Sequence, residues 1–238
     1  MKQVALALVC AAFAHAELKP VTVQAFDRYI KEAQPRLTAE REIRERAVER
    51  LFPDRAEVPG GLIHDWVGAV FIPGTTLEKT LAMVQDYGRH KEIYKPEVVD
   101  SKLLGREGDT YRLHLRLLKQ KVITVVLNTE HEARYYRLGP KRMRSESVST
   151  RIAEVEKAGK PGEREAPPGE GHGFLWRLNS YWQFEERDGG VYVECEAISL
   201  TRNVPAGLGW VIEPIIRRLP RESLANTLRA TSDALREK

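Results

Sequence analysis

The side chains that could carry out acid–base or metal chemistry are spread along the chain. Beyond residue 16 the histidines are His64, His90, His114, His131 and His172. No two of them have the spacing of a zinc-binding HExxH motif, and no cysteine cluster supports a zinc site. The sequence also has no glycine-rich phosphate loop after a strand and no GxSxG elbow. We therefore predict no metal, no cofactor and no catalytic residue.

Two pairs of residues could still act together. Glu194 and Glu196 lie two residues apart, so in a strand they share one face, as an acid–base pair of carboxylates would. We interpret that face as polar and solvated, with the glutamates paired to Arg177 or a neighbouring cation. His64 and Trp66 also share a strand face. A satisfied core or surface histidine is the favoured interpretation of His64, and a functional histidine is the alternative.

The segment 179–204 predicts the hairpin that positions several of these residues. Asp188-Gly189 suits a type I′ turn, which needs positive φ at both central residues. The turn fixes the register, which gives the cross-strand pairs Phe184–Val193, Trp182–Cys195, Ser180–Ala197, Leu178–Ser199, Gln183–Glu194 and Tyr181–Glu196. One face is then apolar or small. Its small residues leave room opposite Trp176 and Trp182, which a helix fills in the favoured interpretation and a ligand in the alternative.

A long amphipathic helix is predicted from residue 207 to the end of the chain. Pro214 is close enough to its start to be tolerated, whereas Pro220 is expected to break or kink it. Beyond Pro220, residues spaced four, three and four apart form one stripe of a helix; they are Leu224, Leu228, Thr231 and Leu235. Such a helix is long enough to cross a sheet of several strands.

The remaining elements are predicted from alternation and turn signals. A strand over 62–72 ends at Pro73-Gly74, and a helix follows with Leu77, Leu81, Val84 and Tyr87 on its buried stripe. Strand-like runs then cover 97–104, 110–118, 122–138, 143–156 and 174–186. The segment 156–173, rich in proline, glycine and glutamate, is either a mobile lid or simply a loop. The second strand of the hairpin is the sixth strand after the helix. The predicted order is therefore one strand, a helix, six strands and a helix.

The N-terminus has the pattern of a secretory signal peptide. An apolar run from Val4 to Phe13 precedes Ala14-His15-Ala16, which predicts cleavage before Glu17 and export to the periplasm or outside the cell. We divide the chain into a signal peptide (1–16), a helical extension and linker (17–61) and a main domain (62–238). Within the extension, 36–50 alternates arginine and glutamate. A solvated surface helix is the favoured interpretation there, and a partner-binding arm is the alternative.

Composition narrows the possible partners. The chain has 238 residues and a net charge of +4, one unit lower once Lys2 is removed, which is too small to argue for nucleic acid. Cys195 is then the single cysteine, so we expect a buried thiol and no internal disulfide. A basic cluster could meet anionic lipid headgroups, in transient contact with a membrane surface, or a carboxylate-bearing ligand. The favoured alternative is a solvated strand edge; the cluster comprises Arg134, Arg137, Lys141, Arg142, Arg144 and Arg151.

The order of elements resembles the helix-grip fold of the START-type, or SRPBCC, superfamily. Its most family-like passages are WVGAVFIPG, from Trp66 to Gly74, and Pro205 to Leu228, with GLGW and PRESLANTL. The resemblance covers about residues 62–235 and looks most like exported bacterial members. It implies an α+β fold, a curved antiparallel sheet of about seven strands closed by a long C-terminal helix. It also implies a hydrophobic or amphipathic ligand between sheet and helix.

These observations lead us to expect an exported binding or carrier protein for a lipid-like small molecule. The expected ligand-binding residues are His64, Trp66, Tyr111, Leu113, Leu115, Trp176, Trp182 and Trp210. The alternative is a cyclase- or hydrolase-like enzyme on the same fold, with His64 or a glutamate as acid or base. A third alternative is a filled core and a role for the surface alone. Fold does not choose among these functions.

Overall fold

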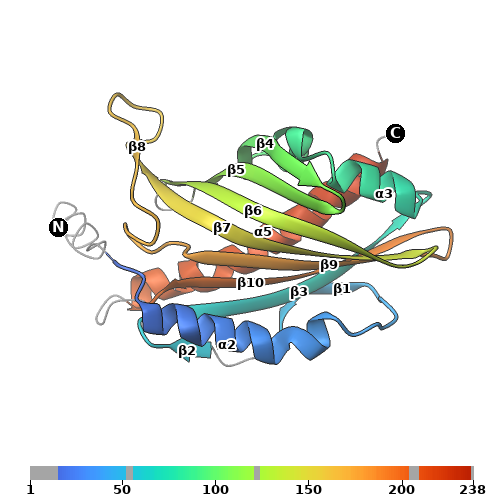
Figure 1. The fold of residues 1–238 in the computed structure, drawn as a ribbon, viewed down its shortest axis with the longest axis horizontal. Coiled ribbons are helices and arrows are strands. Elements are labelled where there is room, and N and C mark those ends of the chain that lie inside the picture. The colour runs from blue at the N-terminus through green and yellow to red at the C-terminus, as the bar shows by residue number, and fades with distance from the viewer. Residues whose placement is uncertain (1–15, 52–55, 121–123, 204–208, 237–238) are drawn as a thin grey trace.

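One antiparallel sheet with helices on both faces forms the protein (Figure 1). The computed structural model describes residues 16–51, 56–120, 124–203 and 209–236, and only the backbone at residues 56 and 209–218. The strands are β1 (Arg46–Arg50), β2 (Ala56–Val58), β3 (Gly61–Pro73), β4 (Val98–Glu107), β5 (Thr110–Gln120), β6 (Thr124–Gly139), β7 (Arg142–Glu156), β8 (Arg164–Glu165), β9 (Arg177–Arg187) and β10 (Gly190–Arg202). This is the predicted helix-grip architecture, with additional strands at its edges.

The strand order places the closing hairpin in the middle of the sheet. The path is β1-β3-β10-β9-β7-β6-β5-β4, with β2 paired to β3 and β8 paired to β7. The register of β9 and β10 is the predicted one, including Trp182 opposite Cys195 and Tyr181 opposite Glu196. Asp188 and Gly189 have φ of 57° and 74°, as a type I′ turn requires. The hairpin prediction is confirmed because turn chemistry is local.

A single helix, α5 (Gly209–Arg236), crosses one face of the sheet, which we call the inner face. It packs mainly on β3 and also contacts β1 and β10. The helix runs without interruption through Pro214 and Pro220, so the predicted break at Pro220 is wrong. Burial of Leu224 and Leu228 against the sheet favours the helical backbone and offsets the hydrogen bond that proline removes.

Short helices cover the other end of the inner face. They are α3 (Leu77–Val84), the 3₁₀ turn η1 (Tyr87–Arg89) and α4 (His90–Ile93). Thr76 caps α3, because its side chain accepts a hydrogen bond from the Lys79 amide. The predicted stripe of this helix is confirmed, since Leu77, Leu81 and Val84 are buried in the inner core. Together with α5, these helices frame the inner face.

The opposite, outer face is covered by α2 (Pro20–Leu37). Phe26, Ala33 and Leu37 pack there on Ile63, Ile198 and other residues of β3 and β10. The helix predicted over 36–50 is wrong, because α2 ends at Leu37 and β1 forms at Arg46–Arg50. In β1 the half-buried and exposed residues alternate, so the regular pattern of this segment has the period of a strand.

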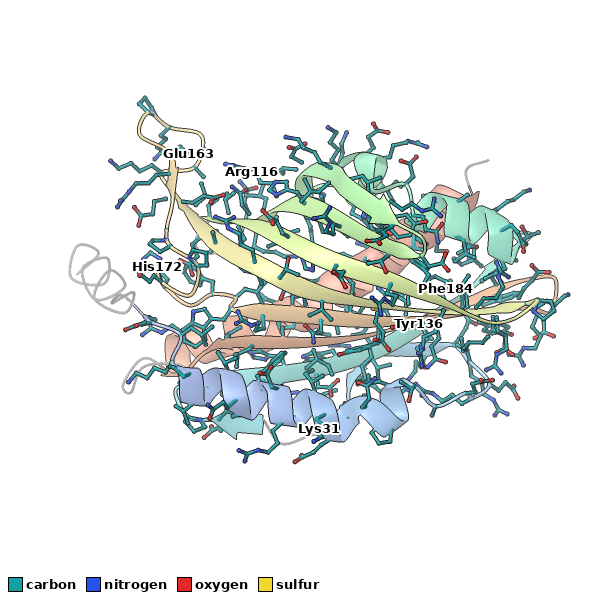
Figure 2. All side chains as sticks on the ribbon, in the orientation of Figure 1. Lys31, Arg116, Tyr136, Glu163, His172 and Phe184 are labelled. Carbon is teal, nitrogen blue, oxygen red and sulfur yellow. The ribbon has the colours of Figure 1, made fainter. Side chains whose placement is uncertain are left out.

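A long arm over 157–173 projects from the end of β7, beside the N-terminal segment (Figure 1). Its Glu163 pairs with Arg116 of β5 at 2.9 Å (Figure 2). Ala16 and Leu18 donate backbone hydrogen bonds to Gly171 and Gly169 of the arm, at 2.6 and 2.8 Å. The arm is therefore held at its middle and near its C-terminal end. None of the helices that the structure describes is long and apolar enough to cross a bilayer.

Candidate functional site

The register of the sheet builds a row of small side chains across the middle of the inner face. Trp66 of β3 and Tyr111 of β5 stand at the two ends of one row that runs perpendicular to the strands. Between them, in order along the row, are Ala197, Ser180, Ser147 and Ala133. We call these four residues the small-residue row. Adjacent strands lie about 4.8 Å apart, so the row and its two aromatic ends span roughly 24 Å.

This row is incompletely covered. Ala197, Ser180 and Ser147 are half-buried although they lie on three central strands of a face that carries helices. The reason is the placement of α5, which packs mainly on β3 rather than over β9 and β7. Small side chains and an off-centre helix together leave accessible space above the middle of the sheet.

Trp182 borders the row on β9. Its ring lies parallel to that of Phe184, with centroids 6.1 Å apart and an interplanar angle of 5°. Phe184 is fully buried, whereas Trp182 is half-buried on the same central strand. The indole Nε1 of Trp182 donates to Ser180 Oγ at 3.2 Å. Trp182 therefore presents an apolar surface beside the row with its polar atom satisfied.

Trp66 at the first end of the row carries an unsatisfied donor. Its Nε1 is buried and has no hydrogen-bond partner among the described residues. The guanidinium of Arg50 lies over the Trp66 ring, 5.0 Å from its centroid. A buried N–H without a partner costs about 1–3 kcal/mol, so it marks a position where an acceptor would be favoured.

Tyrosines and a histidine form the wall at the other end. Tyr87 and Tyr135 share a hydrogen bond of 2.9 Å, and the Tyr111 ring packs on both. Tyr94 Oη lies 3.2 Å from Thr231 Oγ1 of α5, and burial raises the pKa of Tyr94 to about 12. His90 Nε2 lies 3.0 Å from the Val84 carbonyl oxygen. Sequence reasoning does not single out Tyr87 or Tyr135 for a site. The spacing of His90 and Tyr94, four residues apart, allows a place at a cavity mouth as the alternative to ordinary packing.

The buried histidines form hydrogen bonds within the protein. His64 is 3% exposed, with Nε2 3.0 Å from Thr201 Oγ1, which agrees with the favoured interpretation of a satisfied core histidine. His131 Nε2 lies 3.0 Å from Thr129 Oγ1. Burial lowers the pKa of His131 to about 4, and burial lowers that of His90 to about 4 as well. His90 and His131 thus contribute hydrogen bonds rather than charge at neutral pH.

The structure divides the predicted binding residues. Trp66, Tyr111 and Leu113 are buried on the inner face, and Leu115 packs half-buried against the same core. Trp176 lies apart, in the cluster beneath α2 with Phe26 and Leu200. Trp176 immediately precedes β9, so the alternation within the strand does not govern its direction. The side chain of Trp210 lies outside the described residues.

The interpretation of Glu194 and Glu196 as solvated is wrong. They are 5% and 3% exposed, because α2 and the chain that follows it cover the outer face. Arg36 Nη2 donates to Glu196 Oε1 at 2.7 Å, and Arg41 Nη2 donates to Glu194 Oε1 at 2.5 Å. Arg177, the expected partner, instead donates to the Trp176 carbonyl. These carboxylates lie on the face opposite the small-residue row.

A cleft of about 200 Å³ lies beside α5, between the end of β5 and the segment before β4. Lys119 of β5 donates to Ser223 of α5 at 2.6 Å and also pairs with Glu97. Asn226 of α5 donates to Glu97 at 2.7 Å. These hydrogen bonds connect α5 to the end of β5 and to the segment before β4, at the edge of the sheet.

Five of the six residues of the basic cluster on the strand bend pair with neighbouring carboxylates. Arg142 lies 3.5 Å from Glu40, Arg144 lies 3.6 Å from Glu146, and Arg151 pairs with Glu165. Arg134 and Lys141 also have carboxylate partners. The favoured interpretation of a strand edge is wrong, because β6 and β7 each pair with a strand on both sides; the cluster is a charged surface within the sheet. Within the described residues, no group of three histidine, cysteine or acidic side chains could hold a metal ion.

Comparison with known proteins identifies the fold. No family model matches the sequence, and no curated protein matches it. Among solved structures, the protein TTHA0849 from Thermus thermophilus is 16% identical over 73% of this chain and 97% of its own, with a TM-score of 0.52. The STAR-related lipid transfer protein from Xanthomonas axonopodis is 16% identical over 77% of this chain and 98% of its own, at 0.49. The Zhui aromatase/cyclase from Streptomyces is 11% identical over 73% and 94%, at 0.46. The chain shares its fold with TTHA0849, and its antiparallel sheet with a long C-terminal helix is the helix-grip architecture that the sequence resemblance implied.

Proposed function

We propose that this protein is an exported binding or carrier protein for a hydrophobic or amphipathic, lipid-like small molecule. The ligand lies on the small-residue row, between the inner face of the sheet and α5. The observation that carries the proposal is the half-buried state of Ala197, Ser180 and Ser147 on three central strands. A helix-grip protein named for lipid transfer is among the structural neighbours.

The composition of the row favours an amphipathic ligand over a plain hydrocarbon. Trp182 and Leu115 offer apolar surface, and its burial stabilises a complex by about 25 cal/mol per Å². The buried Nε1 of Trp66 would donate to an acceptor such as a carbonyl or hydroxyl oxygen. Binding would thus depend on burial for affinity and on few polar contacts for orientation.

A cyclase- or hydrolase-like activity needs a titratable group beside the row. A protein named aromatase/cyclase also occurs among the structural neighbours. His64, two residues before Trp66 on β3, is the sequence-derived candidate, and its Nε2 lies 3.0 Å from Thr201 Oγ1. No contact in the described structure favours the enzyme over the carrier, so we propose the carrier alone.

The proposal of export rests on the predicted signal peptide. Its residues 1–15 lie outside the described part of the chain. The segment that follows the cleavage site is well anchored, because Leu18 donates to Gly169 of the arm at 2.8 Å. The protein recovered from the exported fraction of its host should therefore begin at Glu17, as N-terminal sequencing would read. Contact with a membrane surface during loading is a further part of the proposal.

Replacement of Trp182 by alanine tests the binding site. Loss of roughly 60 Å² of apolar contact costs about 1.5 kcal/mol, so the Kd for a fluorescent fatty-acid probe should rise about tenfold. Tyr136→Ala is the matched control, because Tyr136 lies half-buried on the outer side of β6 (Figure 2). The guanidinium of Arg144 lies over its ring, 4.5 Å from the centroid. Equal affinities in the wild type and both folded variants would rule out this site.

A further inference from the structure

The outer face of the sheet buries three carboxylates. Asp65 of β3 and Glu194 and Glu196 of β10 are 4%, 5% and 3% exposed. Neighbouring positions on the same face carry apolar residues such as Ile63 and Ile198. Buried carboxylates in such a position are costly unless cations and hydrogen-bond donors satisfy them. The residues that supply these cations and donors therefore identify the segment that the carboxylates hold on this face.

Within the described residues, the cations that pair with these carboxylates come from one stretch of chain, residues 20–46, which we call the strap. Arg36 of α2 donates through Nη2 to both Asp65 and Glu196. Arg41, in the loop after α2, binds Glu194 at 2.5 Å, and Arg46 of β1 lies 3.8 Å from the same glutamate. Tyr29 of α2 donates to Asp65 Oδ2 at 2.7 Å. The cluster is thus the polar half of the interface that holds the strap.

The cations are unevenly distributed among the three carboxylates. Glu194 has Arg41 and Arg46, whereas Asp65 and Glu196 share Arg36. Titratable groups also face the cluster from β9 and β7. Tyr181 of β9 accepts from Asn179, and on β7 Arg144 pairs with Glu146.

One proton would remove the excess negative charge. Burial and the neighbouring Asp65 carboxylate raise the pKa of Glu196 to about 7. Burial also raises the pKa of Asp65, against the opposing effect of Tyr29 and Arg36. Asp65 Oδ1 is buried without a hydrogen-bond partner among the described residues, so the pair has an oxygen free to share such a proton. The unpartnered oxygen of Asp65 and the excess negative charge of the pair both indicate that the pair binds one proton.

We propose that the strap is a pH-sensitive closure of the outer face, held by a proton shared between Asp65 and Glu196. Opening the strap exposes both carboxylates to water, where their pKa values return toward the ordinary range. The closed state therefore binds the extra proton, and it is most favoured in acid. As the pH rises from about 4.5 through about 7, the proton is lost and the strap opens more readily.

Hydrogen exchange of the α2 amides in the full mature protein tests the proposal. After correction for intrinsic exchange rates, the opening equilibrium constant of α2 should increase roughly 10- to 30-fold between pH 5.5 and 7.5. Peptides from β6, which does not contact the cluster, serve as the internal reference. An opening constant for α2 that does not change with pH would overturn the proposal.

Matched variants assign the effect to the shared proton. Glu196→Gln, and independently Asp65→Asn, should each abolish the pH dependence of α2 opening. Glu194→Gln should retain it, because Glu194 has cation partners of its own. Two variants at the pair guard against the failure of either one to fold. Persistence of the full pH dependence in a folded variant of the pair would contradict the proposal.

Discussion

Gly68 shows how single residues set the position of α5 over the inner face. A Cβ at this residue would lie 2.7 Å from Val48 Cγ2 of β1 and 2.9 Å from Leu228 Cδ1 of α5. Both distances are shorter than side chains tolerate, so only glycine lets β1, β3 and α5 pack this closely. The sequence shows a glycine in a strand, but not that a helix rests on it.

We predict that Gly68→Ala lowers the free energy of unfolding by about 1–3 kcal/mol, because a methyl group forces apart packed elements. Chemical denaturation would measure the change. Gly139→Ala is the control, since a Cβ at Gly139 of β6 meets no atom within 4 Å. A stability loss no larger at Gly68 than at Gly139 would disprove the packing argument.

Individual residues also show where sequence reasoning reaches its limit. Alternation along β10 correctly separates Cys195 and Ala197 from Glu194 and Glu196. It does not reveal what covers each face, and from alternation alone the polar face with the two glutamates is expected to be solvated. Burial under the strap depends on contacts such as Arg36 with Glu196, which are 160 residues apart in the chain. Only the tertiary structure brings these charges together.

At the scale of elements, strands with clear alternation and strong turns are predicted well. The strands from β3 to β10 lie within a few residues of their predicted ranges, apart from the two-residue β8. The segment 36–50 is the exception, because arginine and glutamate suit an exposed helix as well as an edge strand. Pairing of β1 with β3 decides between them.

Pro220 provides an element-scale prediction. Within α5 it removes a backbone hydrogen bond, and the packing of Leu224 and Leu228 offsets the loss. Pro220→Ala should therefore raise the free energy of unfolding by about 1–3 kcal/mol. Pro20→Ala should have little effect, because Pro20 lies in the first turn of α2, where proline is tolerated. A lower free energy of unfolding in Pro220→Ala would contradict this prediction, because proline would then stabilise α5.

At the scale of the whole molecule, the two faces of one sheet have different roles. The inner face carries the small-residue row beside α5, and the outer face carries the charged interface of the strap. Consecutive residues of a strand belong to opposite faces. On β3, Asp65 lies in the charged interface of the strap, and Trp66 lies in the core of the inner face. The resemblance to helix-grip proteins predicted the inner face. The N-terminal covering of the outer face required the structure.

Native mass spectrometry of the mature protein, purified from its own host compartment and followed by organic extraction, tests the central claim most directly. We predict a bound, extractable small molecule with an apolar body and at least one polar oxygen group, at one copy per chain. In Trp182→Ala its occupancy should fall, whereas Tyr136→Ala should keep it. The claim would be contradicted if the wild type carried no ligand and also failed to take up a fatty-acid probe added in excess.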